Sequence, residues 1–204
     1  MYSFVKIKNS PVKIKNWCLL FAVQLLLGCS HTSIHRSDYF AAPTTKQNGM
    51  MAHQHIVIKA LESESRLEAV LEFNEQEMTA IFLNEFGQRT ATLKLGLDAA
   101  LTVRKEALIP QSLSPKHSMN AIQHIFWPTS SLIHLDGWKI VENESKRSIF
   151  IEGVLVADVE YGTRCPWSGN SRYVNYRYKY SLTVNSSVLN PPQEIEQNAA
   201  NCFI

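Results

Sequence analysis

Cys165 and the histidines are the side chains of this sequence that could act as nucleophile and base. A cysteine hydrolase needs a histidine beside its thiol, but Cys165 is followed by Pro166-Trp167, which is typical of a loop, and no spacing assigns it a histidine. No motif of the serine hydrolases, zinc peptidases, P-loop enzymes or dinucleotide-binding folds occurs. We therefore expect no enzymatic activity and no cofactor.

Histidines could instead bind a metal ion. His53 and His55 would share one face of a strand, yet the sequence pattern puts no cysteine or acidic residue in register with them, so we interpret them as solvated. His117 and His124 are two helical turns apart without a third ligand, and we expect both at the surface. The sequence thus predicts no metal site.

The first 28 residues have the pattern of a signal peptide. Residues 1–16 carry four lysines and no acidic residue, and residues 17–27 form an apolar run. A membrane-spanning helix needs about 20 apolar residues, so this run favours cleavage over a permanent anchor. Leu26-Leu27-Gly28-Cys29 resembles the bacterial lipobox, in which the cysteine is acylated and becomes the mature N-terminus.

Acylation of Cys29 would make membrane lipid a partner of the protein. The resemblance implies three acyl chains, and stable attachment needs more than one. Ser30 after the cysteine is similar to the sorting signal for the outer membrane, where we expect the protein on the periplasmic face. An ordinary secretory signal cut near Ser30 is the alternative. Cleavage changes the formal charge from +2 to −2, and no nucleic-acid-binding motif occurs, so we expect no nucleic-acid partner.

Besides Cys29, the mature part of the chain contains two cysteines. In an oxidising compartment Cys165 and Cys202 could form a disulfide; alternatively, Cys202 stays free near a polar C-terminus. An apolar content of 45% and 176 mature residues indicate one folded domain with a proper core.

Hydrophobic periodicity divides the mature chain into three parts. Residues 29–52 lack a period and are interpreted as a flexible tether, and residues 191–204 as a polar tail. Residues 53–190 show mainly the alternation of half-buried strands. The sequence predicts strands at 53–59, 67–73, 78–84, 90–95, 101–105, 138–141, 148–151, 154–159 and 174–185. The fold class is therefore α+β, mainly β, with an antiparallel sheet.

One helix interrupts these strands. Apolar residues recur at helical spacing between Pro110 and Pro128, with Ser114-Pro115 as a start signal. The predicted strand 174–185 would direct its tyrosines towards this helix. Side chains of the helix and the strand could line an apolar cavity for acyl chains, or they could simply fill a core. These side chains are Met119, Ile122, Phe126, Trp127, Tyr176, Tyr178 and Tyr180.

The segment Ile81-Phe82-Leu83-Asn84-Glu85-Phe86-Gly87-Gln88-Arg89 resembles the LolB-type outer-membrane lipoproteins, whose third and fourth strands flank a loop with a glycine. The helix ending in Phe126-Trp127-Pro128, the Gly137-Trp138 entry into a strand and the long last strand follow in the same order. Phe86-Gly87-Gln88-Arg89 and Trp127-Pro128 are more closely similar to a LolB-like lipoprotein family often encoded with aryl-polyene or fatty-acid-synthase-like gene clusters.

This resemblance implies a fold, a function and partners. The fold would be a LolA/LolB-like curved antiparallel half-barrel with an inserted helical lid, and the protein would not be an enzyme. Its apolar interior would accept the acyl chains of a lipoprotein, delivered by a periplasmic LolA-like carrier, or an aryl-polyene-type lipid. Phe86, before Gly87, would protrude from its loop and help transfer to the membrane. We expect a monomer. A structural lipoprotein with a packed core that binds a protein partner is the alternative.

Overall fold

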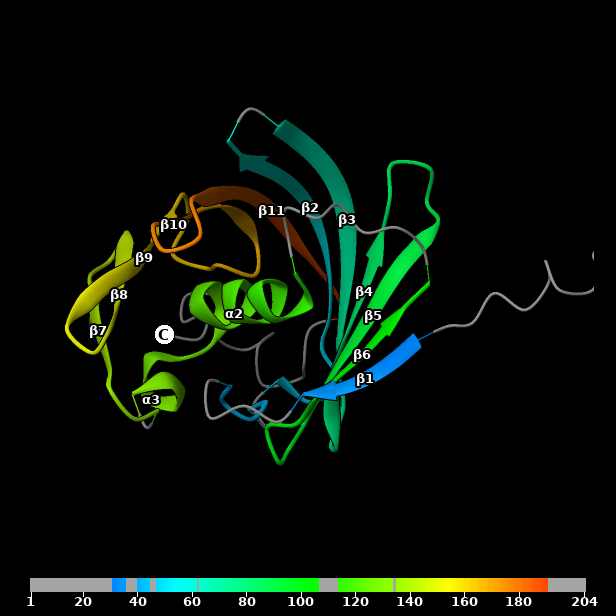
Figure 1. Cartoon of the computed structure of the whole chain (residues 1–204), viewed down its shortest axis with the longest axis horizontal. Coiled ribbons are helices and arrows are strands. Elements are labelled where there is room, and N and C mark those ends of the chain that lie inside the picture. The colour runs from blue at the N-terminus through cyan, green and yellow to red at the C-terminus, as the bar shows by residue number, and fades with distance from the viewer. Residues whose placement is uncertain are drawn as a thin grey trace, which may run out of the picture. The chain divides into compact units, whose positions relative to one another are not determined.

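One antiparallel sheet of eleven strands makes up most of the described chain (Figure 1). The computed structural model describes residues 31–35, 40–44, 47–61, 63–106, 114–133 and 135–190, with the backbone alone for 31–35. The chain divides into two units, residues 1–30 and 31–204, and the described residues all belong to the second. The predicted signal peptide, Cys29, Cys202 and the polar tail lie outside the described residues.

Two meanders of sequential strands build the sheet, and one further strand is added at an edge. The strands are β1 (His31–His35), β2 (Met51–Ala60), β3 (Ser63–Phe73), β4 (Glu77–Leu83), β5 (Arg89–Gly96), β6 (Leu101–Lys105), β7 (Trp138–Glu142), β8 (Lys146–Ile151), β9 (Val154–Tyr161), β10 (Gly169–Asn175) and β11 (Tyr180–Asn190). Their spatial order is β1-β6-β5-β4-β3-β2-β11-β10-β9-β8-β7. The meanders are β2 to β6 and β7 to β11, the pairing of β2 with β11 joins them, and β1 adds an edge strand beside β6. β1 and β7 are the edges of an open sheet.

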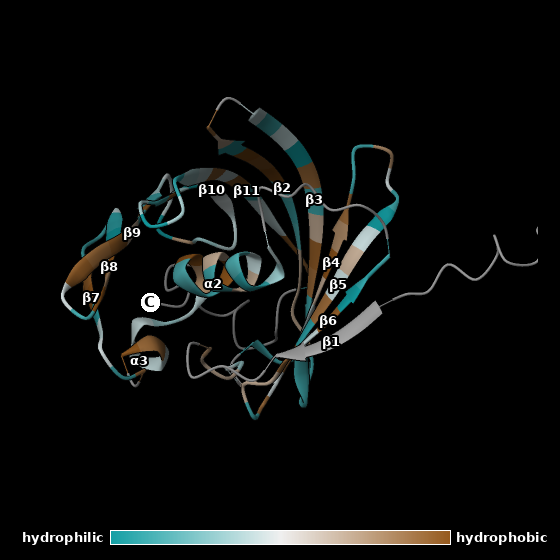
Figure 2. Ribbon diagram, in the orientation of Figure 1, coloured by the Kyte–Doolittle hydropathy of each residue, from teal (hydrophilic) through white to brown (hydrophobic). Residues whose placement is uncertain are grey.

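Alternation of apolar and polar residues decides which face of each strand is buried. In β4, Met78, Ala80 and Phe82 are buried, whereas Thr79 and Ile81 between them are partly exposed. Figure 2 shows brown and teal bands alternating along β3 in the same way. Because a slip of one residue would turn the apolar set to solvent, this pattern also fixes the register of the sheet.

Helix α2 (Pro115–Phe126) lies against the concave side of the curved sheet, and the short helix α3 (Thr129–Leu132) follows it (Figure 1). The Oγ atom of Ser114 accepts a hydrogen bond from the amide of His117 at 3.3 Å, and Pro115 stands in the first turn. The helix ends before Trp127, whose backbone is extended because Pro128 follows. The predicted fold class, a curved antiparallel sheet with an inserted helix, is confirmed.

The alternating residues 174–185 form a hairpin and not one long strand. β10 ends at Asn175 and β11 begins at Tyr180, so Tyr176 and Tyr178 lie in the turn. The Oδ1 atom of Asn175 accepts a hydrogen bond from the amide of Tyr178 at 2.8 Å, and Lys179 takes a positive φ of 55°. This turn contains neither glycine nor proline, the residues that usually mark a turn in a sequence. The alternation of apolar and polar residues therefore continues through the turn without a break.

The region expected to be a flexible tether, residues 29–52, contains ordered structure where it is described. β1 pairs with β6, with His31 opposite Lys105. Phe40 is buried and Met50 is fully buried in the core. The amide of Phe73 donates to the carbonyl of Met50 at 3.0 Å. The sequence of these segments has no regular apolar period, and for this reason the sequence pattern did not reveal the contacts.

Candidate functional site

A small cavity lies between α2 and the middle of the concave face. Ile122 and Phe126 of α2 line it together with Ile56 of β2, Phe82 of β4 and Val184 of β11. Its volume is about 20 Å³. One water molecule needs about 10–15 Å³, whereas pockets for small molecules usually enclose about 300–1,000 Å³. With α2 in this position, the cavity is too small for an acyl chain.

The residues around the cavity include a buried polar side chain. Gln54 lines the cavity, is 1% exposed, and its Nε2 atom has no hydrogen-bond partner among the described residues. Ser186, opposite Gln54 in the register of β2 and β11, is also buried, and its hydroxyl is likewise without a partner in the described part of the chain. A buried unpaired polar group costs about 1–3 kcal/mol, so the side-chain amide of Gln54 is suited to bind a water molecule or a polar ligand atom.

The structure separates the seven residues expected to line an acyl cavity. Ile122 and Phe126 do line the cavity described above, and Met119, Trp127 and Tyr180 are buried in the core around it. Tyr176 and Tyr178 are each 47% exposed and lie outside it, because the hairpin places them in a turn. The hydroxyl of Tyr176 donates to Asp158 at 2.8 Å, and the ring of Tyr178 stacks on His117 at 3.8 Å.

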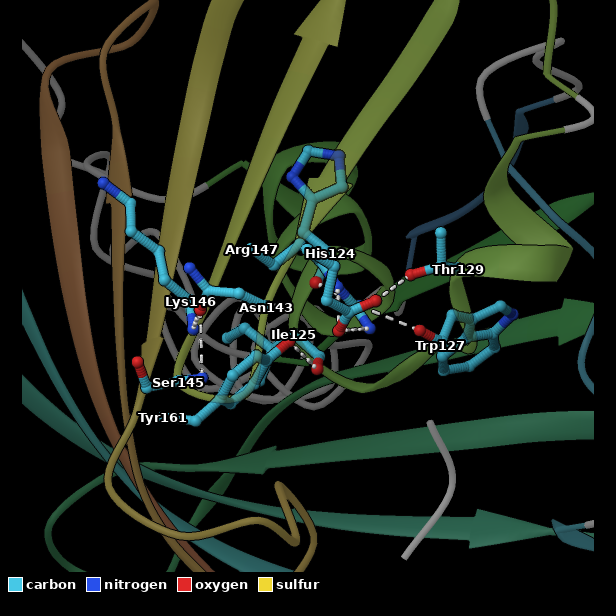
Figure 3. A network of polar contacts seen from close by, with 10 residues as sticks. His124, Ile125, Trp127, Thr129, Asn143, Ser145, Lys146, Arg147 and Tyr161 are labelled. Carbon is cyan, nitrogen blue, oxygen red and sulfur yellow. Dashed lines mark hydrogen bonds and ion pairs between the residues drawn. The ribbon is translucent and has the colours of Figure 1, made fainter.

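Arg147 of β8 is a buried charge beside the C-terminal end of α2 (Figure 3). Its Nη1 atom donates to the backbone carbonyls of His124 and Trp127, each at 2.8 Å. Its Nε and Nη2 atoms donate to Oε1 of Glu142 at 3.1 and 2.8 Å. The other carboxylate oxygen of Glu142 accepts a short hydrogen bond from Thr129, the first residue of α3. The network therefore joins both helices to β7 and β8.

A helix leaves its last four carbonyl groups unpaired, and Arg147 satisfies two of them at the C-terminal end of α2. A positive charge there is also favourable to the helix dipole. Tyr161 of β9 adds a third bond, because its hydroxyl donates to the carbonyl of Ile125 at 2.9 Å, and burial raises the pKa of this hydroxyl. α2 is thus held to the sheet by polar contacts at its end as well as by apolar packing along its length.

Sequence reasoning missed Arg147. The available signal was a lone charge at an inward position of the β8 pattern, where Arg147 and Ile149 are buried on the same face. Such a charge in an apolar row is buried only when it is paired, so it indicates a buried network. The sequence could not identify the partners of Arg147, because two of them are backbone carbonyls at the end of α2.

The expectation that His124 lies at the surface was wrong, since its side chain is only 3% exposed. Burial, together with the charge of Arg147, lowers the pKa of His124 to about 3. Its Nδ1 atom lies 3.0 Å from the hydroxyl of Tyr173, which accepts a hydrogen bond from Asn175 at 2.8 Å. Burial raises the pKa of Tyr173 to about 12. His124 is therefore a neutral core side chain at neutral pH. His117 is partly buried, and this burial lowers its pKa.

The segment before β2 lies across α2. The Nε2 atom of Gln123 donates to the carbonyl of Ala41 at 2.6 Å, and its Oε1 atom accepts from the amide of Ala41 at 3.2 Å. The indole nitrogen of Trp127 donates to the carbonyl of Ala42 at 2.9 Å. The N-terminal segment thus takes part in fixing α2, although it is 82 residues away from Gln123 in sequence.

The hairpin between β4 and β5 displays an apolar side chain to solvent. Phe86 is 85% exposed, next to Gly87, which has a positive φ of 72°. Oδ1 of Asn84 accepts from the amides of Phe86 and Gln88 at 3.0 and 2.9 Å. The turn is therefore locally rigid, and it holds Phe86 away from the core.

Other exposed apolar residues lie at the same end of the sheet. The registers of the strands place the turns β2–β3, β4–β5, β8–β9 and β10–β11 at this end. We call these side chains the apolar rim: Leu61, Phe86, Val154, Leu155, Tyr176 and Tyr178. Leu97, between β5 and β6, lies at the opposite end.

The convex face of β2 and β3 brings two histidines and a carboxylate together. His55 stands opposite Glu68, whereas the sequence pattern suggested no acidic residue in register. Glu68 also lies 3.1 Å from Nε2 of His53. The pairing of β3 with β2 supplies this partner, and a period of two in one strand does not reveal it.

Cys165 is disulfide-bonded. Cys202 lies outside the described residues, so the pairing of these two cysteines stays a prediction. A disulfide sulfur is not a thiolate, so Cys165 in this state is no nucleophile. Among the described residues, no helix has the length and apolar character needed to cross a membrane.

Comparisons with known proteins assign the chain to a family. No curated protein matches the chain. Among solved structures, a domain described as that of an outer membrane lipoprotein-sorting protein of Vibrio parahaemolyticus has 7% identity and a TM-score of 0.40, over 76% of this chain and 92% of that chain. Residues 51–188, from the start of β2 almost to the end of β11, match a family model. The chain therefore belongs to the family described as "Protein of unknown function (DUF3261)".

Proposed function

We propose that this protein is a lipid-anchored carrier of the bacterial envelope that binds acyl chains on the concave face of its sheet. The observation that carries the proposal is the apolar concave face, which α2 covers and which retains an apolar cavity between Ile122 and Val184. The cargo would be the acyl part of a lipid or a lipoprotein. A LolA-like carrier would be the donor.

Binding would require α2 to move away from the sheet, because the cavity of about 20 Å³ is too small for an acyl chain. The sheet is open, with β1 and β7 at its edges. Movement of α2 would leave the pairing of the strands intact, but it would break hydrogen bonds such as those from Arg147 and Tyr161 to the end of α2. An acyl chain would replace the apolar contacts that α2 loses. Gln54 would then meet a polar atom of the cargo or a water molecule.

Anchoring at Cys29 supports an orientation towards the membrane. Cys29 precedes His31 by two residues, a distance of at most about 7 Å along an extended chain. His31 pairs with Lys105, which belongs to the same end of the sheet as the apolar rim. An acyl anchor would therefore attach at the end that carries Phe86. We infer that this end faces the outer membrane and that Phe86 enters its surface during transfer.

A pair of neighbouring substitutions tests cargo binding. Val184 lines the cavity and is 2% exposed, whereas Thr183 is exposed on the convex face of the same strand. We expect the purified protein to bind a fluorescent fatty acid. V184F should lower the affinity at least about 10-fold because it fills the cavity, at a cost of about 1–3 kcal/mol in stability. T183F should leave binding unchanged.

Circular dichroism would confirm that both variants are folded. Absence of probe binding by the unmodified protein, and of lipid in its mass spectrum after purification from membranes, would overturn the proposal. Equal binding by V184F would show that the concave face is not the site. The mass of any bound lipid would also distinguish an ordinary acyl chain from a polyene.

A second candidate is a structural lipoprotein with a packed core. The observation in its favour is the small cavity, because α2 already fills most of the space that an acyl chain would take. The apolar rim would then be the contact surface for a protein partner. In that case the fatty acid probe would not bind, whereas substitutions in the apolar rim would abolish binding of the protein partner.

A further inference from the structure

We propose that His53, His55 and Glu68 form a binding site for a divalent transition metal ion of the Zn²⁺ type on the convex face of the sheet. This site lies on the opposite face from α2 and does not depend on acyl-chain binding. Residues 53 and 55 point to the same side of β2 because side chains alternate along a strand. Glu68 comes from β3, so the ion would join two strands.

The donor atoms converge. Nε2 of His53 lies 3.1 Å from Oε2 of Glu68, and Nδ1 of His55 lies 3.4 Å from Oε1 of the same carboxylate. One ligand atom from each of the three residues lies within 4.8 Å of the others. In a tetrahedral site with bonds of about 2.0–2.1 Å, donor atoms are about 3.3 Å apart. Small side-chain rotations would therefore complete the coordination.

Two imidazole nitrogens and one carboxylate oxygen suit Zn²⁺, Cu²⁺ or Ni²⁺ better than Mg²⁺ or Ca²⁺, which prefer oxygen ligands. The side chains of His55 and Glu68 are 62% and 41% exposed, so an ion can reach them from solvent. Three protein ligands leave a fourth position for water or an anionic group. The site would thus be either a staple between β2 and β3 or a point of contact for an anionic partner.

The convergence also has a simpler explanation, in which Glu68 only accepts hydrogen bonds from the two imidazoles. The two explanations differ in what happens when metal is added. A site with three ligands on a preformed sheet should bind one Zn²⁺ per chain, with a Kd on the order of 10 μM or tighter. When the concentration of free Zn²⁺ is about 100 times the Kd, binding to the folded state alone should raise Tm by about 5–10 °C.

The test uses the full chain, purified and freed of metal with a chelator, and titrated with ZnCl₂ in a calorimeter. We expect H55Q and E68Q each to weaken binding at least about 10-fold and to abolish most of the rise in Tm. E72Q is the matched control, because Glu72 is exposed on the same strand and Met51 stands opposite it. H117Q is the histidine control. Both controls should bind like the unmodified chain.

A second readout is the visible absorption spectrum after addition of CoCl₂. It would show the ligand-field bands of tetrahedral Co²⁺ bound by two nitrogens and one oxygen of the protein and by a fourth ligand such as water. These bands should disappear in H55Q. The proposal is overturned if no stoichiometric binding occurs, or if H55Q and E68Q bind as tightly as the controls, which would mean adventitious binding elsewhere. Since His55 and Glu68 are on the surface, we expect both variants to fold normally, as circular dichroism would verify.

Discussion

Arg147 and Glu142 form an ion pair in which the arginine side chain is 2% exposed and the glutamate side chain 13%. Both Nε and Nη2 of Arg147 donate to the same oxygen of Glu142, and the remaining nitrogen donates to carbonyls at the end of α2. The ion pair therefore neutralises a buried charge and connects α2 to the sheet.

Removal of one partner of this pair should be strongly destabilising. E142A would leave the guanidinium of Arg147 buried without a counter-charge, and we expect a loss of about 3–5 kcal/mol in the free energy of unfolding. Urea denaturation measures this loss. Glu144, in the neighbouring turn, has a side chain that is 89% exposed, and E144Q should change stability by less than about 0.5 kcal/mol. Similar values for both variants would contradict a stabilising role of the network.

Acidification should destabilise the protein through His124. Its pKa is about 3 in the folded state, below the ordinary value of 6.5, so the unfolded chain binds a proton more readily. Stability should therefore fall as pH decreases from about 6.5 towards 3. Between pH 6.5 and 5 the loss from this group is at most about 2 kcal/mol. The difference in unfolding free energy between the unmodified chain and H124Q, measured at several pH values, isolates this contribution.

If the unmodified chain and H124Q lose the same amount of stability at each pH, His124 is not the cause of the loss on acidification. Asp158 also contributes at lower pH. Its burial favours the neutral form, but hydrogen bonds from Ser148, Lys146 and Tyr176 outweigh it and lower the pKa of the carboxyl. The stability that depends on this carboxylate is lost only as pH falls through that lowered pKa. The H124Q variant should still lose the stability that depends on Asp158 as the pH falls through the lowered pKa of that carboxyl.

Phe86 should matter for membranes and not for folding. F86E removes an exposed apolar side chain, so we expect a change of less than about 0.5 kcal/mol in stability and a marked loss of association with lipid vesicles. L97E is the matched control, because Leu97 is 53% exposed at the opposite end of the sheet. Flotation of the proteins with vesicles measures the association. An equal effect of both substitutions would show that the apolar rim has no special part.

Gln123 should hold the N-terminal segment in place. Q123M removes both hydrogen bonds to Ala41 while keeping an unbranched side chain of similar length, and we expect a loss of about 1–3 kcal/mol. The amide of Ala41 should then exchange its hydrogen faster than the amides of β4. Hydrogen exchange measured by mass spectrometry would show this. Unchanged protection at Ala41 would mean that other contacts, such as the packing of Phe40 and the hydrogen bond from Trp127 to Ala42, fix the segment without Gln123.

Much of the fold could be predicted because its signals are local. Alternation of apolar residues identified the strands β2 to β9, and Ser114-Pro115 with Trp127-Pro128 located α2. Gly87 indicated the turn that exposes Phe86. Each of these signals depends on residues close together in sequence, so the chain itself contains the whole pattern.

The site required contacts that no local pattern encodes. Arg147 meets carbonyls of α2, Gln123 meets Ala41, and Glu68 meets His53 and His55 only once the register of β2 and β3 exists. The volume between α2 and the sheet likewise depends on how closely side chains from distant segments interdigitate. The sequence by itself determined which faces of β2 to β9 are apolar and where α2 lies, but it did not reveal β1 or the turn between β10 and β11. Only the tertiary structure decided how much space those faces leave and which polar groups they bring together.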